Sequence, residues 1–245
     1  MGKLFRDKND VLINTKFGNI PFKGKNFNIE DLKESFNQSL TRISRESINI
    51  LFLHNPRDEV EDFKPFLDLM EDLKRKGKIK YKGISLAKGY DYSRKIDLNE
   101  FDVIQDDCSL LSMNFLNMNL LKSTLFMARS PLASGILSDR LTENTSFPKD
   151  DHRSVWLKEE RLASIMKRVN TIKKISNIEL SSLARRFLLK NSKINKIIFG
   201  VKKKSHVDNI IVDLNKPPLD SIIEKKLIEL YRNDYGLNNE RHLGW

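Results

Sequence analysis

The sequence of 245 residues predicts an α/β fold with a parallel sheet, of the TIM (β/α)8 barrel type. Six short apolar runs alternate with amphipathic helical patterns, which is the order of elements that a parallel sheet requires. The runs recur at intervals of roughly 30 residues, the length of one β/α unit. A doubly wound sheet is the competing fold, but it would want a glycine-rich phosphate loop after a strand, and the chain contains no Gly-x-Gly-x-x-Gly.

The first strand and helix are expected within residues 10–43. Residues 10–18 form a short apolar run that closes with Lys16 and Gly18, so we expect a buried strand with a lysine at its exit. Residues 28–43 place apolar side chains three and four positions apart, and Asn28 offers a side-chain cap. An amphipathic helix is therefore expected there.

The next strand carries the strongest signal in the chain. Five of the first six residues of the segment 48–54 are apolar, which is typical of a strand that is buried on both faces. The segment ends abruptly in a polar step from His54 to Pro56. Because α/β enzymes place their chemistry at the carboxyl ends of parallel strands, His54 is a candidate catalytic residue.

The remaining elements continue the alternation. A helix at 63–73 is expected to end in a basic turn with Gly77, because lysines favour the negative helix end and glycine can adopt a positive φ. Residues 138–161 are charged and are expected to form a long loop that leads into a helix. We further expect strands at 80–85, 101–105, 124–129 and 196–200, and helices at 180–189 and 219–231.

The composition, with 39% hydrophobic and 31% charged residues, is that of an ordinary globular protein, and the length suffices for one large α/β domain or two small ones. The sequence has no run of about 18 apolar residues and no signal peptide, so we expect a cytoplasmic protein without a membrane partner. The single cysteine, Cys108, excludes an internal disulfide and a cysteine-based zinc site, and no metal site is predicted.

The charge balance is strongly basic. Lysine and arginine outnumber aspartate and glutamate by 44 to 33, for a net charge of +11, which raises the alternative of a nucleic-acid-binding protein. The lysines are spread over predicted helices and loops, and no DNA or RNA recognition motif is present, so we expect no specific nucleic-acid partner. The alternative predicts salt-sensitive retention of the chain on nucleic acid.

A series of motifs, taken in order, resembles the aldo-keto reductases, which are NAD(P)H-dependent enzymes built on a TIM barrel. NTKFG at 14–18 is similar to the family's third strand with its catalytic lysine. ESFNQSLTRI at 34–43 and INILFLH at 48–54 are similar to the signature helix and the fourth strand with its catalytic histidine. LKRKGKIKYKGIS at 73–85 is similar to the entry into strand five, and SPLASGIL at 130–137 to the loop after strand seven. The resemblance covers essentially the whole chain and implies a single aldo-keto reductase-like domain over residues 1–245.

The resemblance implies catalytic roles for Lys16 and His54. In the family, two β/α units precede the lysine strand, so this chain is expected to be an N-terminally truncated member that supplies strands three to eight and lacks about 60 residues. The family's proton-donating tyrosine and its aspartate belong to that earlier part, and activity is therefore expected to be impaired. We do not expect another tyrosine to replace the missing proton donor. The tyrosines of the chain are Tyr81, Tyr90, Tyr92, Tyr231 and Tyr235.

The resemblance also implies a site for NADP(H), with NAD(H) as the alternative. Ser85 and Gln105 match the residues that hold the nicotinamide carboxamide, whereas Leu86 stands where the family has asparagine. Arg129 matches a position at which many relatives have an aromatic side chain that stacks on the nicotinamide. The other matching positions lie in two loops, one along the pyrophosphate and one around the adenosine phosphate: Ser130, Leu132, Ser134, Gly200, Val201, Lys202, Lys203 and His206.

The predicted function is reduction of an aldehyde or ketone, a small carbonyl substrate, with NADPH preferred. The alternative is a non-catalytic fragment of such an enzyme, retained as a cofactor-binding or interaction module. In an incomplete barrel, the strand edges at residues 11–15 and 196–199 would be unpaired. Such edges favour an oligomer or a partner strand.

Overall fold

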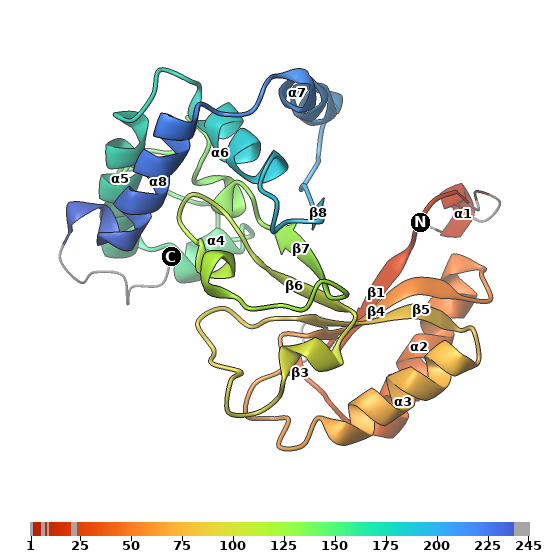
Figure 1. The fold of residues 1–245 in the computed structure, drawn as a ribbon. Coiled ribbons are helices and arrows are strands. Elements are labelled where there is room, and N and C mark those ends of the chain that lie inside the picture. Colours follow the sequence, from red (N-terminus) through yellow and green to blue (C-terminus); the bar gives the residue numbers. More distant parts are fainter. Residues whose placement is uncertain (1, 6–7, 9, 21–23, 238–245) are drawn as a thin grey trace. The chain divides into compact units, whose positions relative to one another are not determined.

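The computed structural model describes residues 2–5, 8, 10–20 and 24–237 (Figure 1). The chain divides into two compact units. Unit 1 comprises Met1–Asp106 and Asn119–Met127, and unit 2 comprises Asp107–Met118 and Ala128–Trp245. Each unit is described in turn.

The strands form the parallel arrangement that the sequence predicts. The order in the sheet is β1-β4-β5-β6-β7-β8, and the ladders from β1 through β4 and β5 to β6 are parallel. The order follows the sequence, as expected when each strand is joined to the next by a right-handed crossover. The bounds of the strands are β1 (Asn14–Phe17), β4 (Ile48–His54), β5 (Ile79–Ser85), β6 (Val103–Asp107), β7 (Leu125–Arg129) and β8 (Lys196–Ile197).

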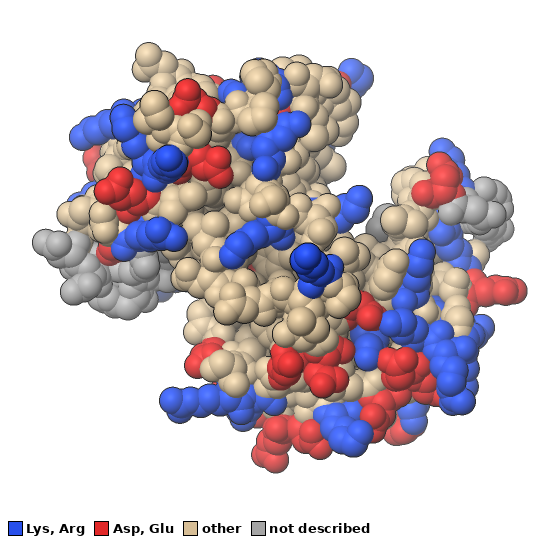
Figure 2. All heavy atoms as spheres, viewed as in Figure 1, with Lys and Arg blue, Asp and Glu red and all other residues tan. Residues whose placement is uncertain are grey.

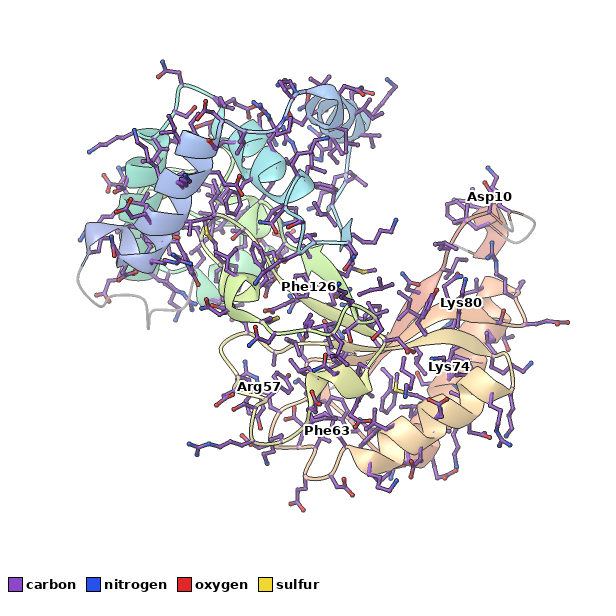
Figure 3. The ribbon with its side chains drawn as sticks, viewed as in Figure 1. Asp10, Arg57, Phe63, Lys74, Lys80 and Phe126 are labelled. Atoms are coloured by element: carbon purple, nitrogen blue, oxygen red, sulfur yellow. The ribbon has the colours of Figure 1, made fainter. Side chains whose placement is uncertain are left out.

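Two amphipathic helices lie along the sheet of unit 1 (Figure 1). Helix α2 (Ile29–Ile43) begins where the Asn28 side chain accepts hydrogen bonds from two backbone N–H groups, which confirms the expected cap. Helix α3 (Lys64–Arg75) ends just before Gly77, whose φ of 69° confirms the expected stop. Figure 3 shows Phe63 at the start of α3 and Lys74 near its end.

Four short elements of unit 1 were not predicted. Helix α1 (Gly2–Phe5) precedes the sheet, and strands β2 (Asn19–Ile20) and β3 (Gly24–Lys25) form an antiparallel pair directly after β1. A 3-10 turn, η1 (Leu98–Glu100), precedes β6. Elements of two to four residues carry too few side chains for a periodic pattern to be recognised.

The strand predicted at 101–105 begins two residues later, at Val103. Phe101 caps the end of η1, and the Asp102 carboxylate accepts hydrogen bonds from the backbone N–H of Lys82 at 2.8 Å and from Lys74 Nζ at 2.9 Å. Through these bonds the Asp102 side chain connects α3 to β5, and the strand begins at the next residue.

Alternation along the strands divides unit 1 into two apolar layers. On one face of the sheet, Ile50, Phe52, Val103 and Met127 form a buried group, with Tyr81 and Leu125 packed against it. The intervening residues of β4, Leu51 and Leu53, point to the opposite face and are buried as well. The sheet is therefore covered on both faces, as its continuous apolar strands require.

Gly83 on β5 leaves room for the Phe52 ring. A Cβ atom at Gly83 would lie 2.4 Å from Phe52 Cδ1 and 3.0 Å from Ile50 Cγ2. We expect Gly83→Ala to lower the free energy of unfolding by about 1–3 kcal/mol through overpacking, measured by urea denaturation. Gly200→Ala is the matched control, because a Cβ there meets no atom within 4 Å and its expected change is below about 0.5 kcal/mol. Equal stability of the Gly83 variant and the wild-type chain would contradict this packing.

Unit 2 is mainly helical. Its helices are α4 (Arg153–Trp156), α5 (Glu159–Lys173), α6 (Leu180–Leu189), α7 (Lys204–Asn215) and α8 (Ser221–Arg232), with 3-10 turns η2 (Asn114–Asn117), η3 (Ala133–Gly135) and η4 (Asp234–Gly236). The helices predicted at 180–189 and 219–231 are confirmed, and the loop before α5 contains the short helix α4. The strand predicted at 196–200 has only two residues, and helix α7 was not predicted.

A buried ionic group joins α6 to α7. Asp213 is 2% exposed, and its carboxylate accepts hydrogen bonds from Arg185 Nε at 2.5 Å and Ser182 Oγ at 2.6 Å. Lys216 Nζ completes the group at 3.1 Å. Burial by itself raises the pKa of Asp213, but these donors outweigh burial and hold the pKa below its usual value.

The exposed charges of unit 1 are mixed in sign. Lysine and arginine side chains are interleaved with aspartate and glutamate over α2 and α3 (Figure 2). Several of these charges pair within one helix, such as Lys64 with Asp68 and Arg75 with Asp72. None of the helices within the described ranges has the length and apolar character needed to cross a bilayer.

Candidate functional site

The strand register of unit 1 brings four of the predicted site residues to one face of the sheet. Residues paired in a parallel ladder point to the same side, and side chains along a strand alternate. Lys16 of β1 is paired with Phe52 of β4. Two residues further along β4, His54 is paired with Ser85 of β5, which is paired with Gln105 of β6. These four polar residues therefore share the face that carries Phe52, toward the carboxyl ends of the strands.

Three of these residues are in direct contact, and we call Lys16, Ser85 and Gln105 the polar cluster. Lys16 Nζ donates to Ser85 Oγ at 3.2 Å and to Gln105 Oε1. The Ser85 hydroxyl donates to Gln105 Oε1 at 3.2 Å. Ser85 and Gln105 are 0% and 1% exposed, whereas Lys16 is exposed and its ammonium lies 5.8 Å from the centre of the Phe52 ring. The cluster is thus a buried hydroxyl and a buried amide, both bonded to the ammonium group of an exposed lysine.

His54 occupies the last position of β4 and is half-buried. Its pairing with Ser85 places it beside the polar cluster in the ladder. The strand end that the sequence predicted for this histidine is confirmed.

Asn55 is a polar neighbour of the cluster that the sequence analysis did not select. Its φ of 53° is left-handed, and its backbone N–H donates to the Ser85 carbonyl at 2.7 Å. With its amide nitrogen turned toward Leu86, the Asn55 side chain donates to the Leu86 carbonyl at 3.0 Å and to Ser85 Oγ at 3.2 Å. The sequence did contain a hint of this role. Asn55 directly follows the strand-ending His54, and asparagine is one of the few residues that tolerate a left-handed backbone conformation.

The loops that follow β4 and β5 are joined by a buried tyrosine. The Tyr92 hydroxyl donates to the Pro56 carbonyl and accepts from the Ala87 N–H at 2.8 Å. Burial raises the pKa of Tyr92 to about 12, so this phenol stays protonated at neutral pH and holds the loops together. Its neighbour Tyr90 donates to Asp58 at 2.7 Å, and this hydrogen bond to a carboxylate raises the pKa of Tyr90.

The other tyrosines each make contacts within their own unit. Tyr231 donates to Asn114 at 2.9 Å and Tyr235 to the Leu110 carbonyl at 2.6 Å, both within unit 2. Tyr81 belongs to the apolar group of unit 1, with Lys80 Nζ 5.4 Å from its ring centre. That no tyrosine of the chain serves as the proton donor stays a prediction.

In unit 2, the loop after β7 has an unusual backbone. Ser130, Ala133 and Ser134 all have positive φ values, of 59°, 47° and 57°. Such conformations cost free energy in non-glycine residues and are found where a loop is held for function. Arg153 fixes this loop, because its Nη1 donates to the Ser134 carbonyl at 3.2 Å. Leu132, the other predicted residue of the loop, is half-buried.

Arg153 is itself held in place. It forms a bidentate pair with Asp151, with a shortest distance of 2.6 Å, and its guanidinium lies 4.5 Å from the centre of the Phe147 ring. The hydrogen bonds from Arg153 hold the pKa of Asp151 far below its usual range. The pair therefore remains ionised across the physiological pH range.

Two further features of unit 2 concern predicted cofactor positions. Gly200, Val201, Lys202 and Lys203 are exposed and lead into α7, where the Lys202 N–H donates to His206 Nδ1 at 3.3 Å. The exposed lysines leave their ammonium groups available to an anion.

Arg129, at the end of β7, pairs with Asp107 at 2.7 Å. The position at which many relatives have an aromatic ring that stacks on the nicotinamide is therefore occupied here by an arginine in an ion pair.

The comparison with protein families identifies the chain. Residues 1–227 match the model of the aldo/keto reductase family. The chain belongs to this family. It is therefore an oxidoreductase by descent, and the resemblance found in the sequence motifs is confirmed. No curated protein matches the chain.

Solved structures of aldo-keto reductases share its fold. The TM-score is 0.73 against the holo form of an aldo-keto reductase from Bacillus halodurans, at 20% identity, and the match covers 94% of this chain and 76% of that chain. It is 0.70 against a glycerol dehydrogenase from Gluconobacter oxydans, at 20% identity and with the same coverage. At identities this low, the similarity is evidence for the fold only. The predicted α/β fold with a parallel sheet is confirmed, and it resembles the barrel of the aldo-keto reductases.

Proposed function

We propose that the chain binds NAD(P)H and that its chemistry is reduction of an aldehyde or ketone, impaired by the lack of a tyrosine proton donor. The observation that carries the proposal is the contact of Lys16 with Ser85 and Gln105 on the face that also bears His54. Two predicted carboxamide-binding residues and one predicted catalytic residue meet there, although they are far apart in the sequence.

The polar cluster fits a primary carboxamide, which presents one acceptor oxygen and an NH2 donor. The Ser85 hydroxyl can donate to the oxygen, and Gln105 Oε1 can accept from the NH2. Because Lys16 Nζ contacts both Ser85 and Gln105, it must move aside when a carboxamide binds. Its exposed, flexible side chain allows this movement at little cost.

The bound cofactor would supply a hydride, and residues of the chain would orient the cofactor and the carbonyl substrate. Ser85 and Gln105 would fix the nicotinamide ring through its amide. Lys16 and His54, at the ends of adjacent strands, would orient the substrate carbonyl. The family resemblance assigns the binding of the cofactor phosphates to the loop with Ser130 and to the segment 200–206. The lysines of this segment would favour NADPH over NADH, because they can pair with a 2′-phosphate.

A carbonyl that accepts a hydride also needs a proton. In the family, a tyrosine supplies it, but four of the five phenols here are bonded to other groups and Tyr81 packs in an apolar group. General acid catalysis contributes about 10²–10⁴-fold, so turnover by these residues is expected to be slow by that factor.

The test is a fluorescence titration of the purified chain with NADPH and NADH, followed by turnover assays with a panel of aldehydes and ketones. We expect saturable NADPH binding with a Kd of about 1 μM to 1 mM and a kcat below about 0.1 s⁻¹. Failure of the folded chain to bind either nucleotide would contradict the cofactor proposal. A kcat above about 1 s⁻¹ would contradict the proposed impairment.

A second candidate function is that of a non-catalytic module which binds a cofactor or a partner. In this proposal the six strands correspond to strands three to eight of the barrel, and β1 and β8 lie at the ends of the strand order. Exposed apolar side chains lie near both strands: Leu12 is 69% exposed and Ile198 41%. NADPH binding without any turnover, together with self-association in sedimentation, would favour this candidate. A cytoplasmic location stays a prediction from the sequence.

A further inference from the structure

We propose that Tyr92 is a positioning residue for His54. Its hydroxyl joins the turn that follows His54 to the turn that follows Ser85, and so fixes the histidine at the end of its strand. The inference rests on the proposed function, in which His54 orients the substrate carbonyl. Tyr92 lies outside the motifs that carry the family resemblance.

The regular pairing of β4 with β5 ends at His54, which is paired with Ser85. The next residue, Asn55, has a left-handed φ of 53° that turns the chain out of the ladder. Its N–H still donates to the Ser85 carbonyl at 2.7 Å. Beyond Asn55, side chains connect the two segments.

The Tyr92 hydroxyl makes a buried connection between these segments. It donates to the Pro56 carbonyl and accepts from the Ala87 N–H at 2.8 Å. Pro56 lies two residues after His54. Ala87 lies two residues after Ser85, so the hydroxyl bridges equivalent positions beyond the two strand ends. A single oxygen that donates to one backbone and accepts from the other fixes the separation of the two segments.

Both backbone groups depend on this hydroxyl. Pro56 and Ala87 are buried, and in the described part of the chain neither the Pro56 carbonyl nor the Ala87 N–H has another hydrogen-bond partner. Leaving buried backbone groups without partners is unfavourable, so loss of the hydroxyl would displace both segments toward water. His54 directly precedes one of these segments and would lose its fixed position.

Two further bonds hold the same turn, but both are exposed. The Asn55 carbonyl accepts from Lys25 Nζ, and Arg57 Nη2 donates to the Lys88 carbonyl at 3.0 Å. Water can replace exposed hydrogen bonds at little cost, whereas it cannot reach a buried bridge without opening the structure. The contribution of Tyr92, which is 4% exposed, is therefore expected to exceed theirs.

The test variant is Tyr92→Phe, which removes only the hydroxyl. The ring keeps its contact with Tyr90, at 4.9 Å between ring centres, and the residue 92 carbonyl keeps its hydrogen bonds from the N–H groups of Lys95 and Ile96. Tyr90→Phe is the matched control, because it makes the same change in the neighbouring ring. The Tyr90 hydroxyl donates to the exposed carboxylate of Asp58 and to no backbone group.

The first readout is the rate at which diethyl pyrocarbonate modifies each histidine of the full chain at neutral pH, followed by mass spectrometry. His54 is half-buried, and we expect its modification to be about tenfold faster in Tyr92→Phe, the factor that one hydrogen bond contributes to a local opening. His152 and His206 lie in unit 2 and should keep their wild-type rates. In Tyr90→Phe all three rates should equal those of wild type.

The second readout separates positioning from cofactor binding. In Tyr92→Phe we expect kcat for carbonyl reduction to fall about tenfold, because a displaced orienting group lowers the rate of the chemical step. The Kd for NADPH should change by less than about threefold, because the hydroxyl contacts none of the predicted cofactor-binding residues.

A third measurement uses the wild-type chain and needs no variant. The Ala87 amide should exchange its hydrogen about 100-fold more slowly than the amide of exposed Gly89, because Ala87 donates to the buried hydroxyl. Exchange of Ala87 at the rate of Gly89 would overturn the inference.

A wild-type rate of His54 modification in Tyr92→Phe would also overturn it. Equal acceleration at His54, His152 and His206 would do the same, because it would indicate a general loosening of the fold. If wild-type protein neither binds NADPH nor reduces a carbonyl, the proposed function fails. The modification and exchange rates would then still decide whether Tyr92 fixes His54.

Discussion

Replacing Arg185 with methionine is expected to lower the free energy of unfolding by about 3–5 kcal/mol at neutral pH. The variant keeps the length and apolar stem of the side chain and removes the guanidinium. Asp213, which is 2% exposed, then loses its 2.5 Å partner and keeps a buried charge that only Ser182 and Lys216 compensate. Urea denaturation monitored by circular dichroism measures the change.

Lys216→Met is the matched control, because Lys216 contacts the same carboxylate with a side chain that is 42% exposed. Its removal should cost less than about 1 kcal/mol, as solvent already screens that pair. If the two variants lost equal stability, burial would not be the cause of the difference.

The loss caused by Arg185→Met should shrink in acid. In wild type, the lowered pKa of Asp213 gives a contribution that is full above the ordinary pKa of 3.8 and is lost as the pH falls through the folded-state pKa. In the variant, the part of this lowering that Arg185 supplies is lost, so the pKa of Asp213 lies above its wild-type value and protonation in acid removes the difference between the two proteins. The stability gap is therefore largest at neutral pH and smallest near pH 3.

Replacing Gln105 with leucine is expected to weaken NADPH binding by about 10–100-fold. The variant has a similar shape but lacks the amide that contacts Lys16 and Ser85 at the proposed carboxamide site. Affinity for 2′-phospho-ADP-ribose should not change, because that ligand has no carboxamide. Calorimetric titration of both ligands measures the difference.

Met127→Leu is the control for this variant. Met127 Sδ lies 3.4 Å from Gln105 Nε2, but a thioether is a weak acceptor, so the expected change in NADPH affinity is below about threefold. Loss of both ligands by Gln105→Leu would indicate a disturbed fold and would contradict a local role for the amide.

Much of the fold of unit 1 could be predicted from the sequence because its elements have strong local signals. The apolar run of β4, the Asn28 cap and the positive φ of Gly77 were all expected and are confirmed. Unit 2 was harder to predict. Helix α7 has several exposed apolar residues, among them Ile211, Val212 and Leu214, so no single apolar stripe marks it.

Only those residues of the candidate site that lie within the family motifs could be predicted from the sequence. The family resemblance selected Lys16, Ser85 and Gln105, and the structure brings them into contact through the strand register. Asn55 was missed because its role depends on a left-handed turn and on a neighbour 30 residues away, neither of which a local pattern encodes. The pairing of Arg129 with Asp107 likewise depends on two strand ends meeting.

The central claim is that the polar cluster binds the nicotinamide carboxamide. The most direct test is the ¹H–¹⁵N spectrum of the Gln105 side-chain amide, assigned with Gln105→Leu, during titration of the full chain with NADPH and with 2′-phospho-ADP-ribose. We predict that the Gln105 NH2 signals move as NADPH saturates and stay in place with 2′-phospho-ADP-ribose. Signals that stay in place while NADPH binds to saturation would contradict the claim.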